Sequence, residues 1–175
     1  MNFTSLTLFV VTFTSILILP GPNSAFAVGQ SLKYGVFGSL PVQFGFMSAT
    51  GLHALLVFSG LGLIFQQHPF ILIILKWFGV MYLLFLAYKA FISKPSKIEV
   101  SPKEISKLKM FLSAMLVSLT NPKALVASIM IYPLFLSAQY SYALQAVVLS
   151  LLAMVISFTI YSAYSMAASA LRHRM

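Results

Sequence analysis

Charge and cysteine are scarce in this sequence. Only 7% of its 175 residues are charged and 60% are hydrophobic, whereas a typical soluble domain is about 25% charged. The mean hydropathy is +0.97, which excludes a soluble globular domain and predicts an integral membrane protein. Because the chain has no cysteine, disulfides, zinc thiolate sites and thiol nucleophiles are excluded.

Acidic residues are almost absent as well. The two acids, Glu99 and Glu104, both lie in the polar segment 93–109, so no hydrophobic segment carries a carboxylate. The serines are mostly scattered singly, and the sequence offers neither a metal-ligating cluster nor a nucleophile beside a base. We therefore expect no enzyme activity, no catalytic residue, no metal and no cofactor.

Positive charge is in excess, and its position is informative. The formal net charge of +9 would suggest a nucleic-acid partner in a soluble chain. Here most of the lysines lie between or beside hydrophobic runs, where they act as signals of membrane topology. We therefore expect membrane lipids, and no nucleic acid, as partners.

Five hydrophobic segments are each longer than the roughly 20 residues that a spanning helix needs. They comprise residues 3–32, 38–65, 70–92, 110–136 and 143–170. The expected fold is all-α: a single integral membrane domain, 1–175, forming a polytopic bundle of about five transmembrane helices. The lysine-rich segment 93–109 is expected to be a cytoplasmic loop, by the positive-inside rule. Counting outward from it places the N-terminus outside and the C-terminus inside.

The first segment also has features of a signal peptide. Residues 6–19 match an apolar core and residues 24–27 a small-residue cleavage site, but no Lys or Arg precedes them. Because four further hydrophobic runs follow, we expect this segment to be retained as a spanning helix.

Two of the five segments contain helix breakers at matched depth. The first break is Pro20-Gly21-Pro22-Asn23 and the second is Asn121-Pro122-Lys123. Pro22 precedes Lys33 by 11 residues and Pro122 follows Phe111 by 11 residues, which puts each break roughly 16 Å from the cytoplasmic side at about 1.5 Å per residue. Broken helices near the midplane, running in opposite directions, are typical of transporters with an inverted repeat. The second half of that repeat has only two segments, so a sixth helix is missing.

The breaks predict a binding site for a zwitterion. The half-helices that restart after Pro22 and Pro122 present amide groups and positive dipole ends, which suit a carboxylate. Lys123 adds a full positive charge, while Asn23 and Asn121 are expected to orient an amino group. The simpler interpretation is that the prolines only kink the helices and the asparagines cap the broken ends.

These motifs resemble those of the LysE/RhtB family of bacterial amino-acid exporters. That family carries PGPN in its first helix, as at residues 20–23, and NPK followed by a small residue in its fourth, as at residues 121–124. Residues 75–83 resemble its helix-three motif, and Gly45 and His53 fall where helix two has a glycine and a frequent histidine. The resemblance implies export of an amino acid across the bacterial inner membrane, with the PGPN and NPK residues as the substrate site.

Four further residues are candidates for the path, each with a simpler interpretation. His53 can carry a transported proton or bridge two helices as a neutral side chain. Gly45 can line the path or mark a close helix contact. Lys76 can line the path or extend toward the external surface. Tyr82 can line the path or pack in the bundle.

The expected function is secondary transport of an amino acid outward by alternating access. Because no membrane segment carries an acid, we expect a neutral substrate, with His53 as the candidate for proton coupling. The alternative is a truncated, non-transporting relative that acts as a membrane assembly or regulatory partner. A homo-oligomer in which partner chains replace the missing helix would preserve transport.

Overall fold

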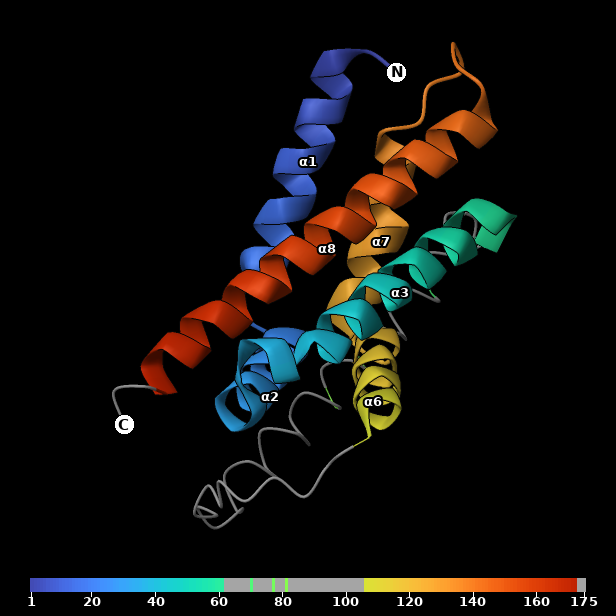
Figure 1. Ribbon diagram of the computed structural model, residues 1–175. Coiled ribbons are helices and arrows are strands. Elements are labelled where there is room, and N and C mark those ends of the chain that lie inside the picture. Colours follow the sequence, from blue (N-terminus) through green and yellow to red (C-terminus); the bar gives the residue numbers. More distant parts are fainter. Residues whose placement is uncertain (62–69, 71–76, 78–80, 82–105, 173–175) are drawn as a thin grey trace.

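The protein is a bundle of α-helices in the computed structural model, which describes residues 1–61, 70, 77, 81 and 106–172 (Figure 1). Six α-helices and one short π-helix make up these parts of the chain. The helices are α1 (Phe3–Ile18), α2 (Pro22–Gly38), α3 (Leu40–Leu56), α6 (Lys107–Leu119), α7 (Pro122–Leu134) and α8 (Tyr142–Arg172), with the π-helix η1 at Val57–Leu61. The expected all-α fold is confirmed.

Two helix pairs are sharply bent at the two positions where the sequence predicts breaks. Helices α1 and α2 meet at an angle of 65°, and α6 and α7 meet at 62°. Both α2 and α7 begin with a proline at the first helical position, where the missing N–H would have had no helical partner. At each break, therefore, one helix ends and a regular new helix begins.

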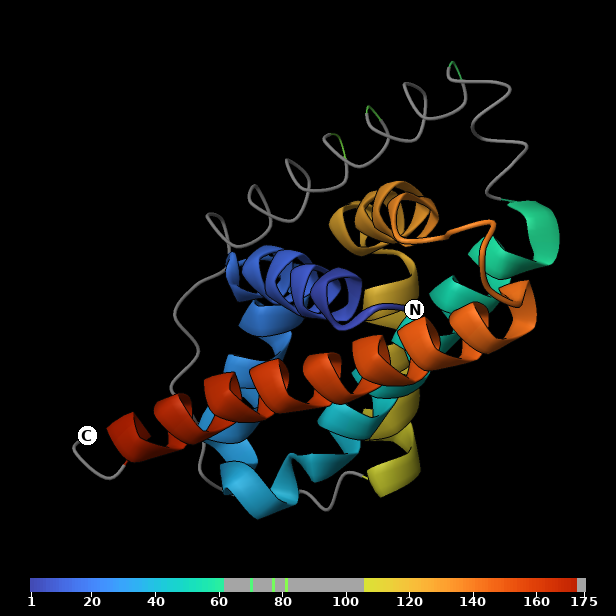
Figure 2. The same ribbon diagram turned by 90° about the horizontal axis from the view of Figure 1, so that it is seen from above.

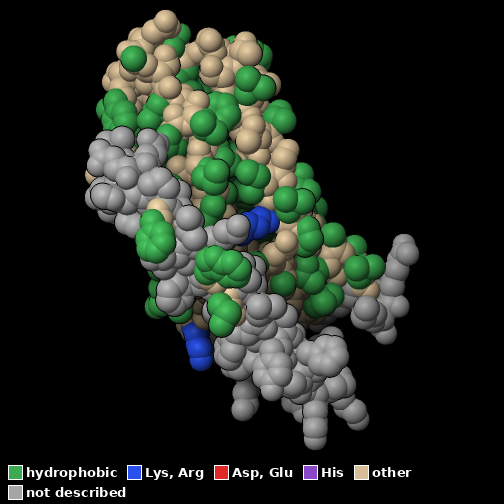
Figure 3. Space-filling view, turned by 180° about the vertical axis from the view of Figure 1, so that it is seen from behind, with side chains coloured by type: hydrophobic (Ala, Val, Ile, Leu, Met, Phe, Trp, Pro, Cys, Tyr) green, Lys and Arg blue, Asp and Glu red, His purple; other side chains and the backbone are tan. Residues whose placement is uncertain are grey.

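Up to four spans of a membrane are present in the described residues. Leu40–Gly60 and Tyr142–Leu171 are long and apolar enough alone, and each bent pair adds one span if it is counted as a unit. Hydrophobic side chains cover most of the described surface in Figure 3, and outward-facing Leu151 and Val155 on α8 are more than half exposed. Such a surface suits lipid, so the chain is a membrane protein.

The first two spans are joined by a tight reversal just after Lys33. The helical backbone of α2 is interrupted at Gly35, whose φ of 74° and ψ of 176° favour glycine, and Ser39 separates Gly38 from α3. The predicted end of the first segment, around Lys33, thus lies next to this interruption.

Helix α8 is the longest helix and packs against α1, α2 and α3 (Figures 1 and 2). Polar contacts fasten it to the bundle. Thr50 Oγ1 donates to Ser157 Oγ at 3.0 Å, Ser31 Oγ donates to the Ser165 carbonyl at 2.6 Å, and Gln43 donates to Ser165 Oγ. Hydrogen bonds between small polar side chains are a common way to join helices in lipid.

An aromatic group packs between α1, η1 and α7. Its members are Phe9, Phe13, Phe58, Tyr132 and Phe135, and the ring of Tyr132 lies 5.0 to 5.9 Å from those of Phe9, Phe13 and Phe58. Tyr132 is fully buried, and its hydroxyl has no partner within the described residues. This aromatic group joins α1, η1 and α7.

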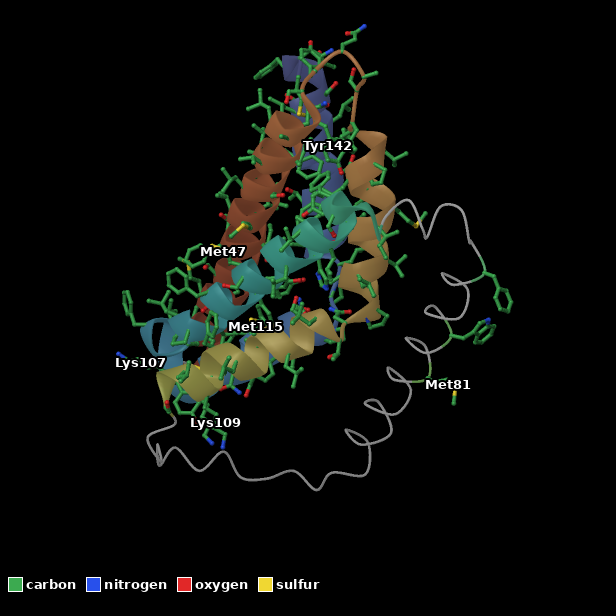
Figure 4. All side chains as sticks on the ribbon, turned by 90° about the vertical axis from the view of Figure 1, so that its right-hand side faces the viewer. Met47, Met81, Lys107, Lys109, Met115 and Tyr142 are labelled. Atoms are coloured by element: carbon green, nitrogen blue, oxygen red, sulfur yellow. The ribbon has the colours of Figure 1, made fainter. Side chains whose placement is uncertain are left out.

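The two ends of the molecule differ in charge. Lys107 and Lys109 lie at one end and Tyr142 at the other (Figure 4), while the N- and C-termini lie at opposite ends (Figure 1). The predicted third segment, 70–92, and most of the basic loop 93–109 fall outside the described residues.

Helices α3 and α6 lie side by side and touch at Gly45. A Cβ atom added at Gly45 would lie 2.5 Å from the carbonyl oxygen of Phe111 and 2.9 Å from Cβ of Ala114. Because the first contact is with backbone, no side-chain rotation relieves it. Gly45 is therefore a close helix contact, the simpler of its two predicted roles.

Gly45→Ala is expected to destabilise the bundle by about 1–3 kcal/mol, since α3 and α6 must separate to admit the methyl group. Gly29→Ala is the matched control: nothing lies within 4 Å of its added Cβ atom, so the protein should gain about 0.5–1 kcal/mol. Thermal unfolding in detergent micelles measures both. Equal melting temperatures for the two variants would contradict the close contact.

Candidate functional site

The first break is ordered by its own backbone and by a serine. Gly21 is extended, its N–H donates to Ser24 Oγ at 2.8 Å, and Ser24 Oγ donates to the Gly21 carbonyl at 2.9 Å. Pro20 and Pro22 have no N–H to offer to the preceding turn. The carbonyls at the end of α1 must therefore find partners elsewhere.

Two side chains from other helices supply those partners. Tyr164 on α8 donates its hydroxyl hydrogen to the carbonyl of Ile18. Lys123 on α7 donates from Nζ to the carbonyl of Leu19. The end of α1 is thus satisfied by tertiary contacts, as hydrocarbon surroundings require.

The second break is capped by its asparagine. Asn121 is extended, its N–H donates to the Ser118 carbonyl at 3.1 Å, and its Oδ1 accepts from the N–H of Lys123 at 3.0 Å. The prediction that Asn121 caps the broken end is confirmed.

The two breaks touch through their asparagines. Asn121 Nδ2 donates to Asn23 Oδ1 at 2.9 Å, and Asn23 Nδ2 donates to Ser118 Oγ at 3.0 Å. Both asparagines are 2% exposed. Residues 98 positions apart therefore form one buried amide network, which we call the asparagine bridge.

A small cavity adjoins the asparagine bridge. Its volume is about 20 Å³, close to what one water molecule needs. Its polar lining residues are Asn23, Thr50, His53, Ser118, Asn121, Lys123, Ser128 and Tyr161. Its apolar lining residues are Phe13, Ile16, Leu17, Ala124 and Ala127.

His53 lines this cavity. Its side chain is 2% exposed, and its Nε2 atom has no hydrogen-bond partner within the described residues. A buried polar atom without a partner is costly unless a ligand or water meets it.

Lys123 is half-buried, and its Nζ atom donates to the carbonyl of Leu19. Both acids of the chain lie in segment 93–109, outside the hydrophobic runs. Within the described residues, no group of three or more His, Cys, Asp or Glu side chains could hold a metal ion. The site therefore presents a positive charge that an anionic group can complement.

The structure brings together most of the predicted site. Gly21 and Pro22 lie at the first break, with Lys123 Nζ 3.6 Å from a Cβ atom added at Gly21, while Pro122 starts α7 beside Asn121. Gly45 lies apart, against α6. Lys76 and Tyr82 lie outside the described residues, so their predicted roles stay predictions.

Sequence reasoning missed the site residues that no local pattern marks. Tyr161 and Ser128 line the cavity, Tyr164 holds the Ile18 carbonyl, and the hydroxyl of Ser118 completes the asparagine bridge. Isolated serines and tyrosines in apolar helices usually pack helices together, so their sequence signal is weak. Ser118 alone carried a hint, because it lies one helical turn before Pro122.

Comparison with known proteins identifies the family of this chain. Residues 14–175 match the LysE type translocator family. A homoserine/homoserine lactone efflux protein of Salmonella typhimurium is 26% identical over 158 residues, which cover 90% of this chain and 77% of the relative. An uncharacterized membrane protein of Vibrio cholerae is 25% identical over 164 residues, covering 93% of this chain and 80% of the relative. No solved structure matches the chain.

The match covers both breaks and the cavity, and the named relatives are efflux proteins. The chain is thus a transporter and not an enzyme, and it belongs to the LysE type translocator family.

Proposed function

We propose that this protein exports a neutral amino acid across the bacterial inner membrane by alternating access. The observation that carries the proposal is the junction of the two breaks, where Lys123 holds a carbonyl and borders a cavity beside the asparagine bridge. A carboxylate bound there would neutralise the Lys123 charge and meet the amide ends of α2 and α7.

The walls of the cavity favour a neutral side chain on the substrate. Phe13, Leu17 and Ala127 offer apolar contact, and no acid is available in the hydrophobic segments to pair with a cationic side chain. The Salmonella relative is named for homoserine and its lactone, and homoserine is a neutral amino acid. Homoserine, threonine and leucine are therefore the first candidates.

The small cavity volume supports a transport cycle with a closed state. An amino acid is much larger than the single water that about 20 Å³ admits, so helices must separate for it to enter. On the side of the N-terminus the aromatic group forms the barrier. In our topology that side is external and the Lys107 end is cytoplasmic, by the positive-inside rule.

His53 is the proposed proton carrier. Its side chain lines the cavity, its buried Nε2 atom has no partner among the described residues, and histidine can change its charge near neutral pH. Lys123 and Tyr161 are the other titratable side chains lining the same cavity. A proton on His53 would repel the Lys123 ammonium, which couples protonation to substrate release in this proposal.

Lys123→Ala is expected to reduce efflux of a labelled amino acid from preloaded cells about tenfold or more, because the substrate loses a hydrogen bond to a charged group. Lys109→Ala, which removes an exposed lysine at the start of α6, is the matched control and should export normally. If the inserted and folded parent exports neither homoserine, threonine nor leucine, the proposal fails. That result would favour the non-transporting assembly or regulatory partner.

His53→Gln is expected to separate substrate movement from proton movement, because glutamine keeps an amide near the imidazole position but does not titrate. In reconstituted vesicles, an imposed pH gradient should accelerate efflux by the parent and have no effect on the variant. An electrical potential imposed without a pH gradient is the control. A variant that keeps the full response to the pH gradient would rule out His53 as the proton carrier.

A further inference from the structure

The carbonyl groups at the end of helix α1 can attract a positively charged group. The last carbonyls of a helix carry partial negative charge and favour a positive group. Here the break leaves the carbonyls of Ile18 and Leu19 without helical donors, and Lys123 and Tyr164 take their place. One of these two donors, Lys123, is an ammonium group.

The two donors differ in how firmly they are placed. Tyr164 is a rigid side chain on α8, which packs against α1. Lys123 reaches the Leu19 carbonyl from the other half of the molecule, and its Cδ and Nζ atoms lie along the backbone of Gly21. A lysine stem has four flexible carbons, so its ammonium group can move without moving a helix.

Other acceptors at the site are already engaged. Asn23 Oδ1 accepts from Asn121, and Asn121 Oδ1 accepts from the N–H of Lys123. These bonds hold the two breaks together, so giving them up for an amino group would cost stability. The asparagines, expected from sequence to orient the amino group, are therefore better suited to holding the frame of the site.

A second feature points independently to a ligand in this place. His53 lines the same cavity as Lys123, and its buried Nε2 atom has no partner within the described parts of the chain. The site thus combines an unpaired ring nitrogen, an ammonium group and a carbonyl held by that ammonium. A small molecule with both a donor and an anionic group would complement all three.

We infer that the Leu19 carbonyl binds the ammonium group of a zwitterionic substrate, and that Lys123 occupies this position while the site is empty. When the substrate enters, its carboxylate draws the Lys123 ammonium away, and its own ammonium group replaces Lys123 at the Leu19 carbonyl. The Lys123 ammonium then pairs with the substrate carboxylate, and the substrate ammonium pairs with the carbonyl dipole of Leu19. The inference rests on the proposed function, whose binding site it specifies.

The exchange makes the site selective for zwitterions. An amine without a carboxylate would have to displace Lys123 and leave two positive charges together. A carboxylate without an amine would draw Lys123 away and leave the Leu19 carbonyl unpaired, which costs about 1–3 kcal/mol in an apolar place. Both halves of the substrate are therefore needed at once.

Calorimetric titration of the purified full chain in detergent micelles tests this on the parent protein. The probes are homoserine, propanolamine, which lacks the carboxylate, and γ-hydroxybutyrate, which lacks the amine; leucine, isoamylamine and isocaproate form a second set. Each half-molecule should bind at least about tenfold more weakly than its amino acid. An amine that binds as tightly as its amino acid would overturn the inference.

Lys123→Met makes the test specific to the exchange, because methionine keeps an unbranched side chain and removes the ammonium group. The amino acid should bind at least about tenfold more weakly than to the parent, whereas the amine should bind more tightly, since the Leu19 carbonyl is now unoccupied. Lys109→Met is the matched control and should change neither affinity. If both probes weaken together in a folded variant, the Leu19 carbonyl is not the ammonium site.

The outcomes separate the inference from the proposed function. Absence of binding for every amino acid in the parent, together with absence of export, would refute the proposed function itself. Binding and export of an amino acid without the expected difference between probes would refute the exchange alone. If Lys123→Met does not fold, the probe series on the parent chain still decides the question.

Discussion

The structure depends on the requirement that backbone polar groups find partners inside hydrocarbon. Two breaks in spanning helices release carbonyl and amide groups at a depth where water does not supply partners. Each break is completed largely by the other half of the molecule or by α8: Lys123 and Tyr164 satisfy α1, and Asn23 pairs with Asn121. The same contacts that make the breaks tolerable therefore also bring the two halves together and form the site.

Much of this arrangement could be predicted from the sequence because its signals are local. Long apolar segments, Pro22 and Pro122 at matched depth, and a lysine beside the second proline each have a direct physical meaning. The observed bends of 65° and 62° confirm the two broken helices. Asn121 as a cap also follows from its position before Pro122.

The remaining features depend on tertiary packing, which no local pattern encodes. The sequence places Asn23 and Asn121 at similar depth, but only the crossing of α2 and α6 puts their amides in contact with each other and with Ser118. Tyr164 reaches Ile18 because α8 packs along α1. Likewise, the sequence predicts that the first segment ends near Lys33, but only the structure shows the kink at Gly35 and the turn at Ser39.

The site joins one fixed contact to one that can move, and this difference explains how a broken helix can serve transport. The asparagine bridge is buried and made of short side chains, so it holds the two breaks at a constant separation. Lys123 is half-buried on a flexible stem and holds a carbonyl that another ammonium can take. The asparagine bridge therefore keeps the two breaks in place while the Lys123 ammonium exchanges its hydrogen-bond partner. We expect the helices to separate during transport at the apolar contacts around Tyr132. Within the described residues, no hydrogen bond to the Tyr132 hydroxyl has to break there.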